Sequence, residues 1–240
     1  IEINYKIRSF KKPTKNLVLF ADKNFNISGL KKYISNTEFS YISDLLKNSD
    51  LKKNLLFFEV NSKKTIFLVS IKEKIEASDI ESLGAEFHSY INYDKKNEYS
   101  INSDSINSKF ENFLGHFLHG LKLKSYEFNI YKSKKNTKYI SINVIGNENK
   151  ITTKNELRFR AIEKGTFFAR DLVSEPPNVL NPKEYVNRLL KLRKLGIKVT
   201  VYNESQMKNL GMHSLLGVGR GSINESFLVT LEWNGNKKDK

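Results

Sequence analysis

The chain has no cysteine among its 240 residues. This absence excludes disulfide bonds, thiolate catalysis and zinc sites of the cysteine type. It fits a reducing compartment, where stable disulfides are rare. The sequence also lacks any run of about 18 apolar residues, so we expect no membrane-spanning helix. No charged segment followed by an apolar one opens the chain, and we expect no secretory signal.

Negative charge is scarce as well. The chain carries 41 Lys and Arg against 26 Asp and Glu, which gives a net charge of +15. The excess is spread out, with +8 in residues 1–150 and +7 in residues 151–240, and only seven of the basic residues are Arg. Asn and Ile are also plentiful, a combination typical of an AT-rich genome. This pattern favours a solvated lysine surface, and a polyanion-binding surface is the alternative.

The residues that are present can build a core, because 39% are hydrophobic and 16 Phe and 11 Tyr are among them. Strand-like runs alternate with helix-like runs, which predicts an α/β fold. A hairpin turn is expected at residues 61–64, where Asn, Ser and Lys join two strand-like runs. The predicted strands are Leu17–Phe20, Leu55–Val60, Thr65–Ile71, Tyr139–Ile145, Lys198–Tyr202 and Phe227–Trp233.

Three helices carry capping-box signals in which a hydroxyl residue precedes a glutamate by three positions. These signals are Ser78 with Glu81, Ser108 with Glu111, and Thr153 with Glu156. The third opens a long helix that Pro176 and Pro177 should end, since neither proline has a backbone N–H to donate. We expect its buried stripe to consist of Leu157, Ala161, Gly165, Phe168 and Leu172.

A further helix should begin at Asn181, with Pro182 in its first position, and end at Gly196. A strand and a short helix follow, and Gly211 stops that helix. The polar stretch at residues 146–150 is the best domain boundary. Residues 151–240 then hold too few elements for a complete second domain.

Several motifs invite a functional reading that their context does not support. The spacing of Gly217, Gly219 and Gly221 suggests a phosphate loop, but a helix precedes it and a strand follows, so we expect a tight connection instead. His116 and His119 share a helix without a nearby ligand partner, so we expect flanking or part-buried histidines rather than a metal pair. The segment from Glu175 to Asn178 is predicted to be architectural.

Two blocks of residues nevertheless carry a specific resemblance. The first runs from Arg170 to Pro182, and the second from Leu210 to Ser222. The strand at residues 228–235 follows them, and a weaker match covers residues 121–135. In this order they resemble the leucyl aminopeptidases, also called cytosol aminopeptidases. The matching positions are Arg170, Asp171, Leu172, Pro176, Asn178, Pro182, Met207, Leu210, Gly211, Met212, Leu215, Leu216, Gly217, Val218, Gly219, Gly221 and Ser222.

The resemblance implies a fold and an organisation. Residues 1–150 would form a macro-domain-like, mixed-sheet N-terminal domain. Residues 151–240 would form a long linking helix and the first βα elements of an incomplete α/β metallopeptidase catalytic domain. The intact enzyme would be a cytoplasmic homohexamer that hydrolyses N-terminal residues from peptides with two divalent ions, manganese or zinc.

The resemblance assigns no site residue to this chain. The family's ligands are one lysine, three aspartates and one glutamate, with an assisting arginine, and all lie downstream of the matched strand. We therefore expect no catalytic, cofactor-binding or metal residue here, and we nominate neither Asp171 nor Glu175. The chain alone should be inactive. The alternative function is a basic nucleic-acid-binding α/β module without enzymatic activity.

Overall fold

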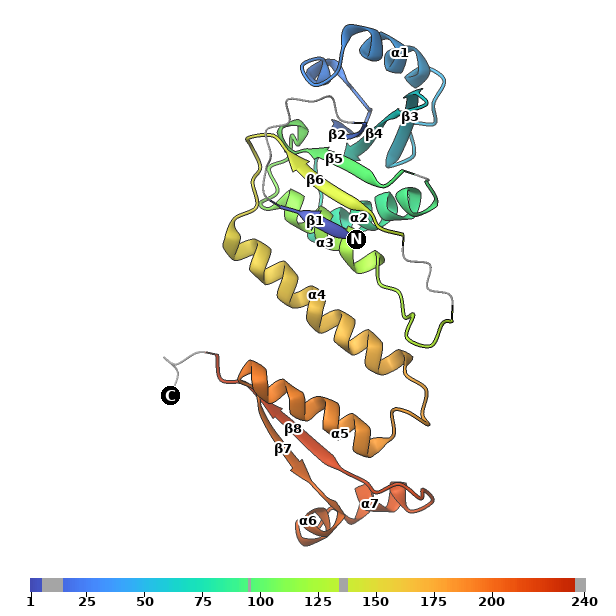
Figure 1. The fold of residues 1–240 in the computed structure, drawn as a ribbon. Helices are drawn as coiled ribbons and strands as arrows, with labels where there is room; N and C mark the ends of the chain where they lie inside the picture. The colour runs from blue at the N-terminus through green and yellow to red at the C-terminus, as the bar shows by residue number, and fades with distance from the viewer. Residues whose placement is uncertain (6–14, 95, 134–137, 236–240) are drawn as a thin grey trace. The chain divides into compact units, whose positions relative to one another are not determined.

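A computed structural model describes residues 1–5, 15–94, 96–133 and 138–235 (Figure 1). The chain divides into two compact units, Ile1–Phe167 and Phe168–Lys240. The first is an α/β unit and the second is a small unit of helices and a two-stranded ribbon. The predicted α/β class is therefore confirmed. The predicted domain boundary at residues 146–150 stays a prediction. The division into compact units does not show where a functional domain begins.

The N-terminal unit is built on a six-stranded mixed sheet with the order β1-β6-β5-β2-β4-β3. Only the β3–β4 pair is antiparallel. The central strands β2 and β4 are buried along nearly their whole length, as expected of strands covered on both faces. The strands are β1 (Glu2–Asn4), β2 (Asn16–Asp22), β3 (Leu55–Asn61), β4 (Lys64–Ile71), β5 (Glu98–Asn102) and β6 (Ser141–Ile145).

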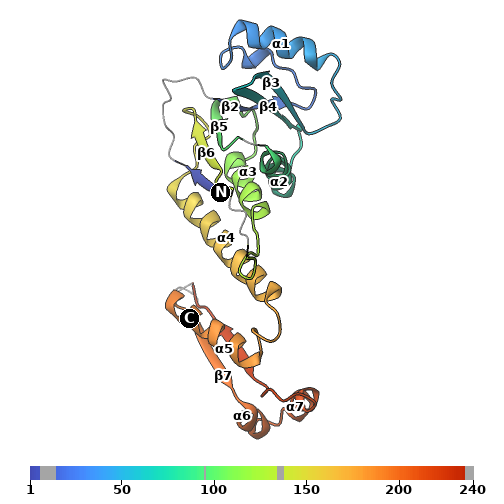
Figure 2. The ribbon, with the colours of Figure 1, turned by 45° about the vertical axis from the view of Figure 1, so that its right-hand side comes forward.

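Helices cover both faces of this sheet (Figures 1 and 2). Alternate residues of β2 show the two faces, since Val18 and Phe20 belong to one apolar cluster and Leu17 and Leu19 to the other. Helix α1 (Asn36–Leu46) packs on the Leu17 face. Helices α2 (Ala77–Tyr93) and α3 (Phe113–Lys124) pack on the Val18 face.

Most predicted strands of this unit are confirmed, and the hairpin turn is too, because Lys63 N donates to Asn61 Oδ1 between β3 and β4. The strands β1 and β5 were missed. β1 has only three residues and its pairing partner β6 lies more than a hundred residues away. β5 reads Glu-Tyr-Ser-Ile-Asn, and Ser100 and Asn102 are buried within it. A strand with polar residues at buried positions does not show the apolar pattern from which strands are predicted.

All three predicted capping boxes are wrong, the third by one residue, because Thr152 and not Thr153 caps its helix. Helix α2 is capped two residues earlier, by Glu76 together with Asp79. Ser108 Oγ instead accepts from Phe110 N in a turn, and α3 begins only at Phe113. Asn112 before it adopts a left-handed conformation with φ of 58°. The chain therefore turns sharply before α3 and cannot extend the helix back to Ser108.

The long helix α4 (Thr153–Ser174) is a single helix, as predicted, although its buried face differs from the predicted stripe. Thr152 caps it, since Asn155 N donates to Thr152 Oγ1. Phe159 and Glu163 are the buried residues of the helix. Among the predicted stripe, Leu157, Ala161 and Gly165 are exposed, while Phe168 and Leu172 are half-buried. Phe159 faces inward because its ring lies against Gly115 of α3, where no side chain occupies the space.

The C-terminal unit follows the predicted order of elements. Asn181 Oδ1 accepts from Glu184 N and caps α5, and Gly196 and Gly211 adopt the left-handed conformation at the expected helix ends. β7 and β8 pair as an antiparallel ribbon. The elements are α5 (Pro182–Leu190), a 3-10 turn (Lys191–Leu195), β7 (Lys198–Tyr202), α6 (Glu204–Asn209), α7 (His213–Gly219) and β8 (Leu228–Glu232).

No helix in the described ranges of the chain is both long and apolar enough to cross a membrane.

Candidate functional site

The turn after α4 carries a buried carboxylate that α5 engages. Glu175 has a side chain only 3% exposed, and its Oε1 lies 2.9 Å from Nη1 of Arg188. Nε of Arg188 donates to Glu184 Oε1 at 3.1 Å. These hydrogen bonds to Glu175 and Glu184 raise the pKa of the Arg188 guanidinium. The Glu175 carboxylate therefore holds α5 against the turn through this ion pair. This contact agrees with an architectural role for the segment.

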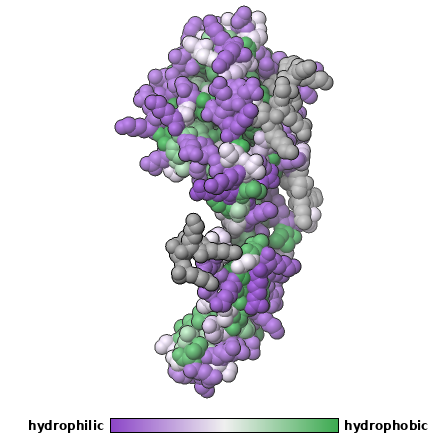
Figure 3. Space-filling view, turned by 90° about the vertical axis from the view of Figure 1, so that its left-hand side faces the viewer, coloured by the Kyte–Doolittle hydropathy of each residue, from purple (hydrophilic) through white to green (hydrophobic). Residues whose placement is uncertain are grey.

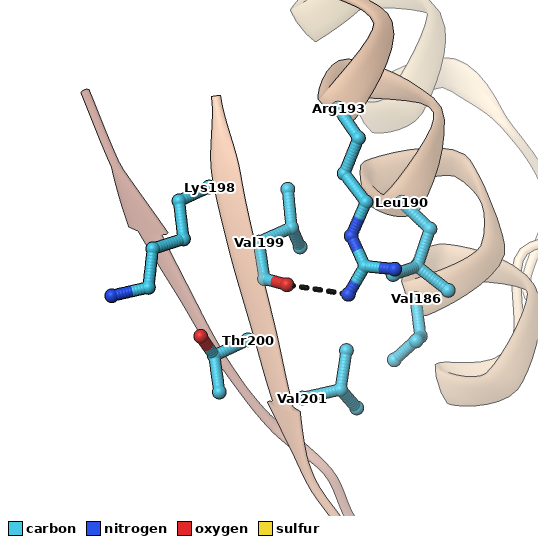
Figure 4. Close-up of a pocket in the computed structure, with 7 residues that line it drawn as sticks. All are labelled: Val186, Leu190, Arg193, Lys198, Val199, Thr200 and Val201. Atoms are coloured by element: carbon cyan, nitrogen blue, oxygen red, sulfur yellow. Dashed lines mark hydrogen bonds between the residues drawn. The ribbon is translucent and has the colours of Figure 1, made fainter. Parts of the chain in front are cut away.

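An open groove of about 670 Å³ lies between α5 and β7 (Figure 4). Val186 and Leu190 line it from the helical side, and Val199 and Val201 line it from the strand. Arg193 reaches toward the strand, where its Nη2 donates to the backbone oxygen of Val199 at 2.6 Å. The groove combines apolar side chains with a guanidinium that is already bonded. It is suited to packing against another apolar segment rather than to chemistry.

The glycine-rich segment does not form a phosphate loop. Gly217 and Gly219 lie inside the short helix α7, and the expected tight connection is corrected accordingly. Neither they nor Gly221 has a positive φ. A Cβ added to Gly219 would lie 2.1 Å from Oγ of Ser226. Only this side-chain hydroxyl lies close, since Cβ of Ser226 is at 3.5 Å, so a small rotation of Ser226 would make room for a side chain.

The two histidines of α3 pair with different carboxylates. His116 Nδ1 lies 2.8 Å from Glu81 Oε1 on α2, and His119 Nδ1 lies 3.3 Å from Glu163 Oε1 on α4. Phe159 packs against both imidazoles, with ring centroids 5.0 and 5.2 Å apart. These pairs join α3 to its neighbouring helices and do not converge on a common point. His116 is part-buried, as predicted, whereas His119 is buried, which the sequence interpretation did not foresee.

Metal ligands do not gather in the described part of the chain. Residues 1–5, 15–94, 96–133 and 138–235 contain no group of three or more His, Cys, Asp or Glu side chains placed to hold an ion. They therefore do not fit a two-metal centre, which needs several oxygen or nitrogen ligands around each ion. The expectation that this chain holds no site residue stays a prediction.

Comparisons with known proteins connect the C-terminal unit to one family. Residues 167–240 match the model of the catalytic domain of the cytosol aminopeptidase family. A curated probable cytosol aminopeptidase from Agrobacterium fabrum is 40% identical over 131 residues, which cover 52% of this chain. That stretch is longer than the C-terminal unit, so the likeness extends into the N-terminal unit. The resemblance to the cytosol aminopeptidases is confirmed.

The solved structures agree on the fold. A mutant of tomato leucine aminopeptidase superposes with a TM-score of 0.78 over 96% of this chain, at 18% identity. A bottromycin maturation enzyme in complex with Mn gives a TM-score of 0.67 over 92% of the chain, at 15% identity. At these identities the likeness concerns the fold. The mixed sheet that the family resemblance implied is the sheet observed in this fold.

The chain spans half or less of the proteins that it resembles. The match covers 26% of the Agrobacterium fabrum protein and 50% of the tomato chain. The predicted family blocks from Arg170 to Trp233 lie inside the range of the family model. The weaker segment at residues 121–135 lies outside that range, and its last residues, 134 and 135, lie outside the described residues.

Proposed function

We propose that this chain is the N-terminal part of a leucyl aminopeptidase, a metal-dependent hydrolase that removes N-terminal residues from peptides. The single observation that carries the proposal is the 40% identity to a probable cytosol aminopeptidase over 131 residues. The match of residues 167–240 to the family's catalytic domain supports it independently. In this proposal the activity belongs to the whole protein.

The proposal divides the chain by role. Residues 1–150 are a macro-domain-like N-terminal domain, and residues 151–240 are the linking helix with the beginning of the catalytic domain. The start of α4 at Thr153 supports a boundary just before it. The first part of α4 packs on α3 through Phe159, so the linking helix is anchored in the N-terminal unit.

The surface of the C-terminal unit supports its place in a larger domain. Hydrophilic residues dominate the visible face of the N-terminal unit, whereas green hydrophobic residues gather near the bottom of the view in the C-terminal unit (Figure 3). A two-stranded ribbon is marginal by itself and normally gains further strands or packing partners. The large apolar side chains exposed in this unit are Val173, Tyr185, Leu195, Leu210, Leu215, Val218, Ile223, Leu231 and Trp233.

The metal ions belong to the same proposal. The family resemblance implies two divalent ions, manganese or zinc, and the bottromycin maturation enzyme was solved in complex with Mn. The described residues of this chain do not fit such a centre. We therefore assign none of them a part in metal chemistry. The homohexamer and the cytoplasmic location are proposed from the resemblance alone.

The test is made on the product of the whole reading frame that encodes this chain. The purified protein is incubated with Mn²⁺ and Leu-Gly-Gly, and release of free leucine is measured before and after addition of EDTA. The same peptide with an acetylated N-terminus is the control. We expect chelator-sensitive release from the free peptide only. Absence of release, or equal release from both peptides, contradicts the proposal.

The alternative function is that of a basic nucleic-acid-binding module. It is tested by measuring how DNA binding depends on salt concentration. Binding that rests on neutralised phosphates weakens steeply with ionic strength. The charge of the chain is divided evenly between its two parts, which favours a solvated surface. We expect no saturable binding of a 20-base-pair duplex at 150 mM salt.

A further inference from the structure

The edge of the N-terminal sheet carries a cavity with aromatic walls. β3 is the last strand of the sheet (Figure 1), and α2 packs on the Val18 face of the same sheet. The cavity lies between α2 and the β3–β4 pair and has a volume of about 470 Å³, within the range of small-molecule sites. All of its lining residues precede residue 167, where the match to the catalytic domain begins. The proposed peptidase function therefore leaves this cavity without a role.

The alternation of side chains along β3 and β4 builds one wall of the cavity. Phe57 lies opposite Phe67 in the antiparallel register, and Glu59 lies opposite Thr65. Residues two apart on a strand point to the same face, so both pairs are on the side of the sheet that α2 covers. This wall therefore places an aromatic pair next to a carboxylate.

Aromatic rings from the strands and from the helix border the space. The ring centroid of Phe57 lies 6.0 Å from that of Phe67 and 5.6 Å from that of Tyr90 on α2. Tyr93 lies one turn after Tyr90 and also lines the cavity. Phe57 is 50% exposed and Tyr93 is 88% exposed. Large apolar side chains that gather around a cavity and stay open to solvent are typical of a ligand site.

The lining of the cavity is negatively charged, although the chain as a whole is basic. Among the described residues that line it, Glu59 and Asp94 are the charged ones. The Glu59 side chain is 72% exposed, and its Oε1 lies 3.7 Å from Nζ of Lys96, which is beyond hydrogen-bond distance. Lys96 Nζ donates instead to Oγ1 of Thr65. The Glu59 carboxylate can therefore turn toward a cation in the cavity.

Asp94 follows the last turn of α2 and is held as an acceptor. Its carboxylate accepts from the hydroxyl of Tyr99 at 3.0 Å and from the backbone N–H of Lys96 at 3.1 Å. Burial raises the pKa of Tyr99, and the charge of Asp94 raises it further, so Tyr99 keeps the proton that it donates. Lys138 Nζ donates to the backbone oxygens of Ile91 and Asp94 at the end of the helix. The charge that a ligand meets in the lining is therefore that of the two carboxylates.

A cation with apolar substituents matches these walls. The faces of aromatic rings attract cations, and carboxylates add their opposite charge. A primary ammonium group needs three hydrogen-bond acceptors, whereas ring faces offer no lone pairs and Asp94 already accepts two hydrogen bonds. We propose that this cavity binds a small organic cation whose nitrogen carries alkyl groups, of the quaternary ammonium class. Phe57, Tyr90 and Tyr93 provide the aromatic surface, and Glu59 and Asp94 provide the negative charge.

The experiment titrates the 240-residue chain with choline in a calorimeter. Neohexyl alcohol, the uncharged carbon analogue of the same shape, and ethanolamine, the corresponding primary amine, are separate probes. We expect choline to bind saturably and about tenfold more tightly than either probe, because only choline combines a positive charge with apolar substituents. Absence of saturable choline binding overturns the proposal. Binding of either probe as tight as that of choline overturns it too.

Two variants at exposed positions separate the aromatic contribution from the charge. Tyr93→Leu keeps an apolar side chain but removes a ring, and it should weaken choline binding about fivefold, the effect of one lost cation–π contact. Tyr185→Leu is its matched control, since Tyr185 is an exposed tyrosine on α5. Glu59→Gln should weaken choline binding but not change the binding of neohexyl alcohol, and Glu225→Gln at another exposed glutamate is its control. Equal choline affinity in the parent and both cavity variants would contradict the assignment of the site.

The headgroup of phosphatidylcholine carries the same cation on a membrane, so vesicles of this lipid form a further arm. We expect the protein to stay in the supernatant when the vesicles are sedimented, because the proposed ligand is a free solute. Sedimentation of the protein with the vesicles would assign the cavity to a lipid and overturn the proposal. No peptide or metal ion enters these assays, so their outcome is independent of aminopeptidase activity.

Discussion

Gly84 of α2 and Gly120 of α3 each lie against the backbone of the other helix. A Cβ added to Gly84 would lie 1.9 Å from the carbonyl oxygen of Phe117, and one added to Gly120 would lie 1.9 Å from that of Glu81. These distances are far below van der Waals contact, and the atoms concerned are backbone. The two helices that cover the Val18 face of the sheet therefore cross at a distance that only glycine allows.

We predict that Gly84→Ala and Gly120→Ala each lower the free energy of unfolding by at least about 2 kcal/mol, because the helices must separate to admit a methyl group. Gly165→Ala is the control on α4, where a Cβ meets nothing within 4 Å. It should raise the free energy of unfolding by about 0.5–1 kcal/mol, because alanine favours a helix over glycine. Urea denaturation of the three variants gives the values, and a stable Gly84→Ala variant would show that the crossing is wider.

A second prediction concerns the face of α4. Phe159 is 6% exposed and packs on α3, whereas Leu157, two residues earlier, is 63% exposed. We expect Phe159→Ala to cost about 3 kcal/mol of stability through lost burial and a cavity. Leu157→Ala should cost less than about 0.5 kcal/mol, as for most surface changes. Thermal melts of the two variants of the 240-residue chain decide this, and equal shifts in the melting temperature would refute the observed facing.

A third prediction concerns pH. Burial lowers the pKa of His88, and the positive charges of the N-terminus and Lys124 lower it further, while Glu127 opposes them. Below the ordinary value of about 6.5 the unfolded chain binds a proton that the folded chain resists. The contribution of His88 to stability is therefore present above that pH and lost as the pH falls.

We accordingly predict that the parent loses more stability between pH 7.5 and pH 5 than His88→Leu does. The other histidines are the same in both proteins, so the difference between the two pH profiles isolates His88. Urea midpoints at five pH values measure it. Parallel profiles for the parent and the variant would mean that His88 takes up its proton as readily in the folded state as in the unfolded one.

Much of the fold could be predicted from local patterns. The strand-like runs of β2, β4 and β7, the cap at Asn181 and the end at Gly196 all rest on short-range rules that the structure obeys. β1 and β5 could not be found this way, because pairing with a distant strand stabilises them rather than their own composition.

The facing of α4 shows a different kind of limit. Apolar residues occur on several sides of this helix, among them Leu157, Phe159 and Ile162. Periodicity alone cannot choose between such faces, and the choice falls to Phe159 because Gly115 leaves room for its ring. The aromatic cavity between α2 and the β3–β4 pair was missed for a related reason. Its lining residues come from separate parts of the sequence, and only the fold brings them together.

The central proposal is that the chain is the N-terminal part of an aminopeptidase and that its described residues do not hold the metal centre. The most direct measurement is a calorimetric titration of residues 1–240 with Mn²⁺, followed by an assay of leucine anilide hydrolysis on the same sample. We predict no stoichiometric binding and no turnover, because the described residues provide no cluster of three ligands. Binding of two ions together with hydrolysis that EDTA abolishes would contradict the account.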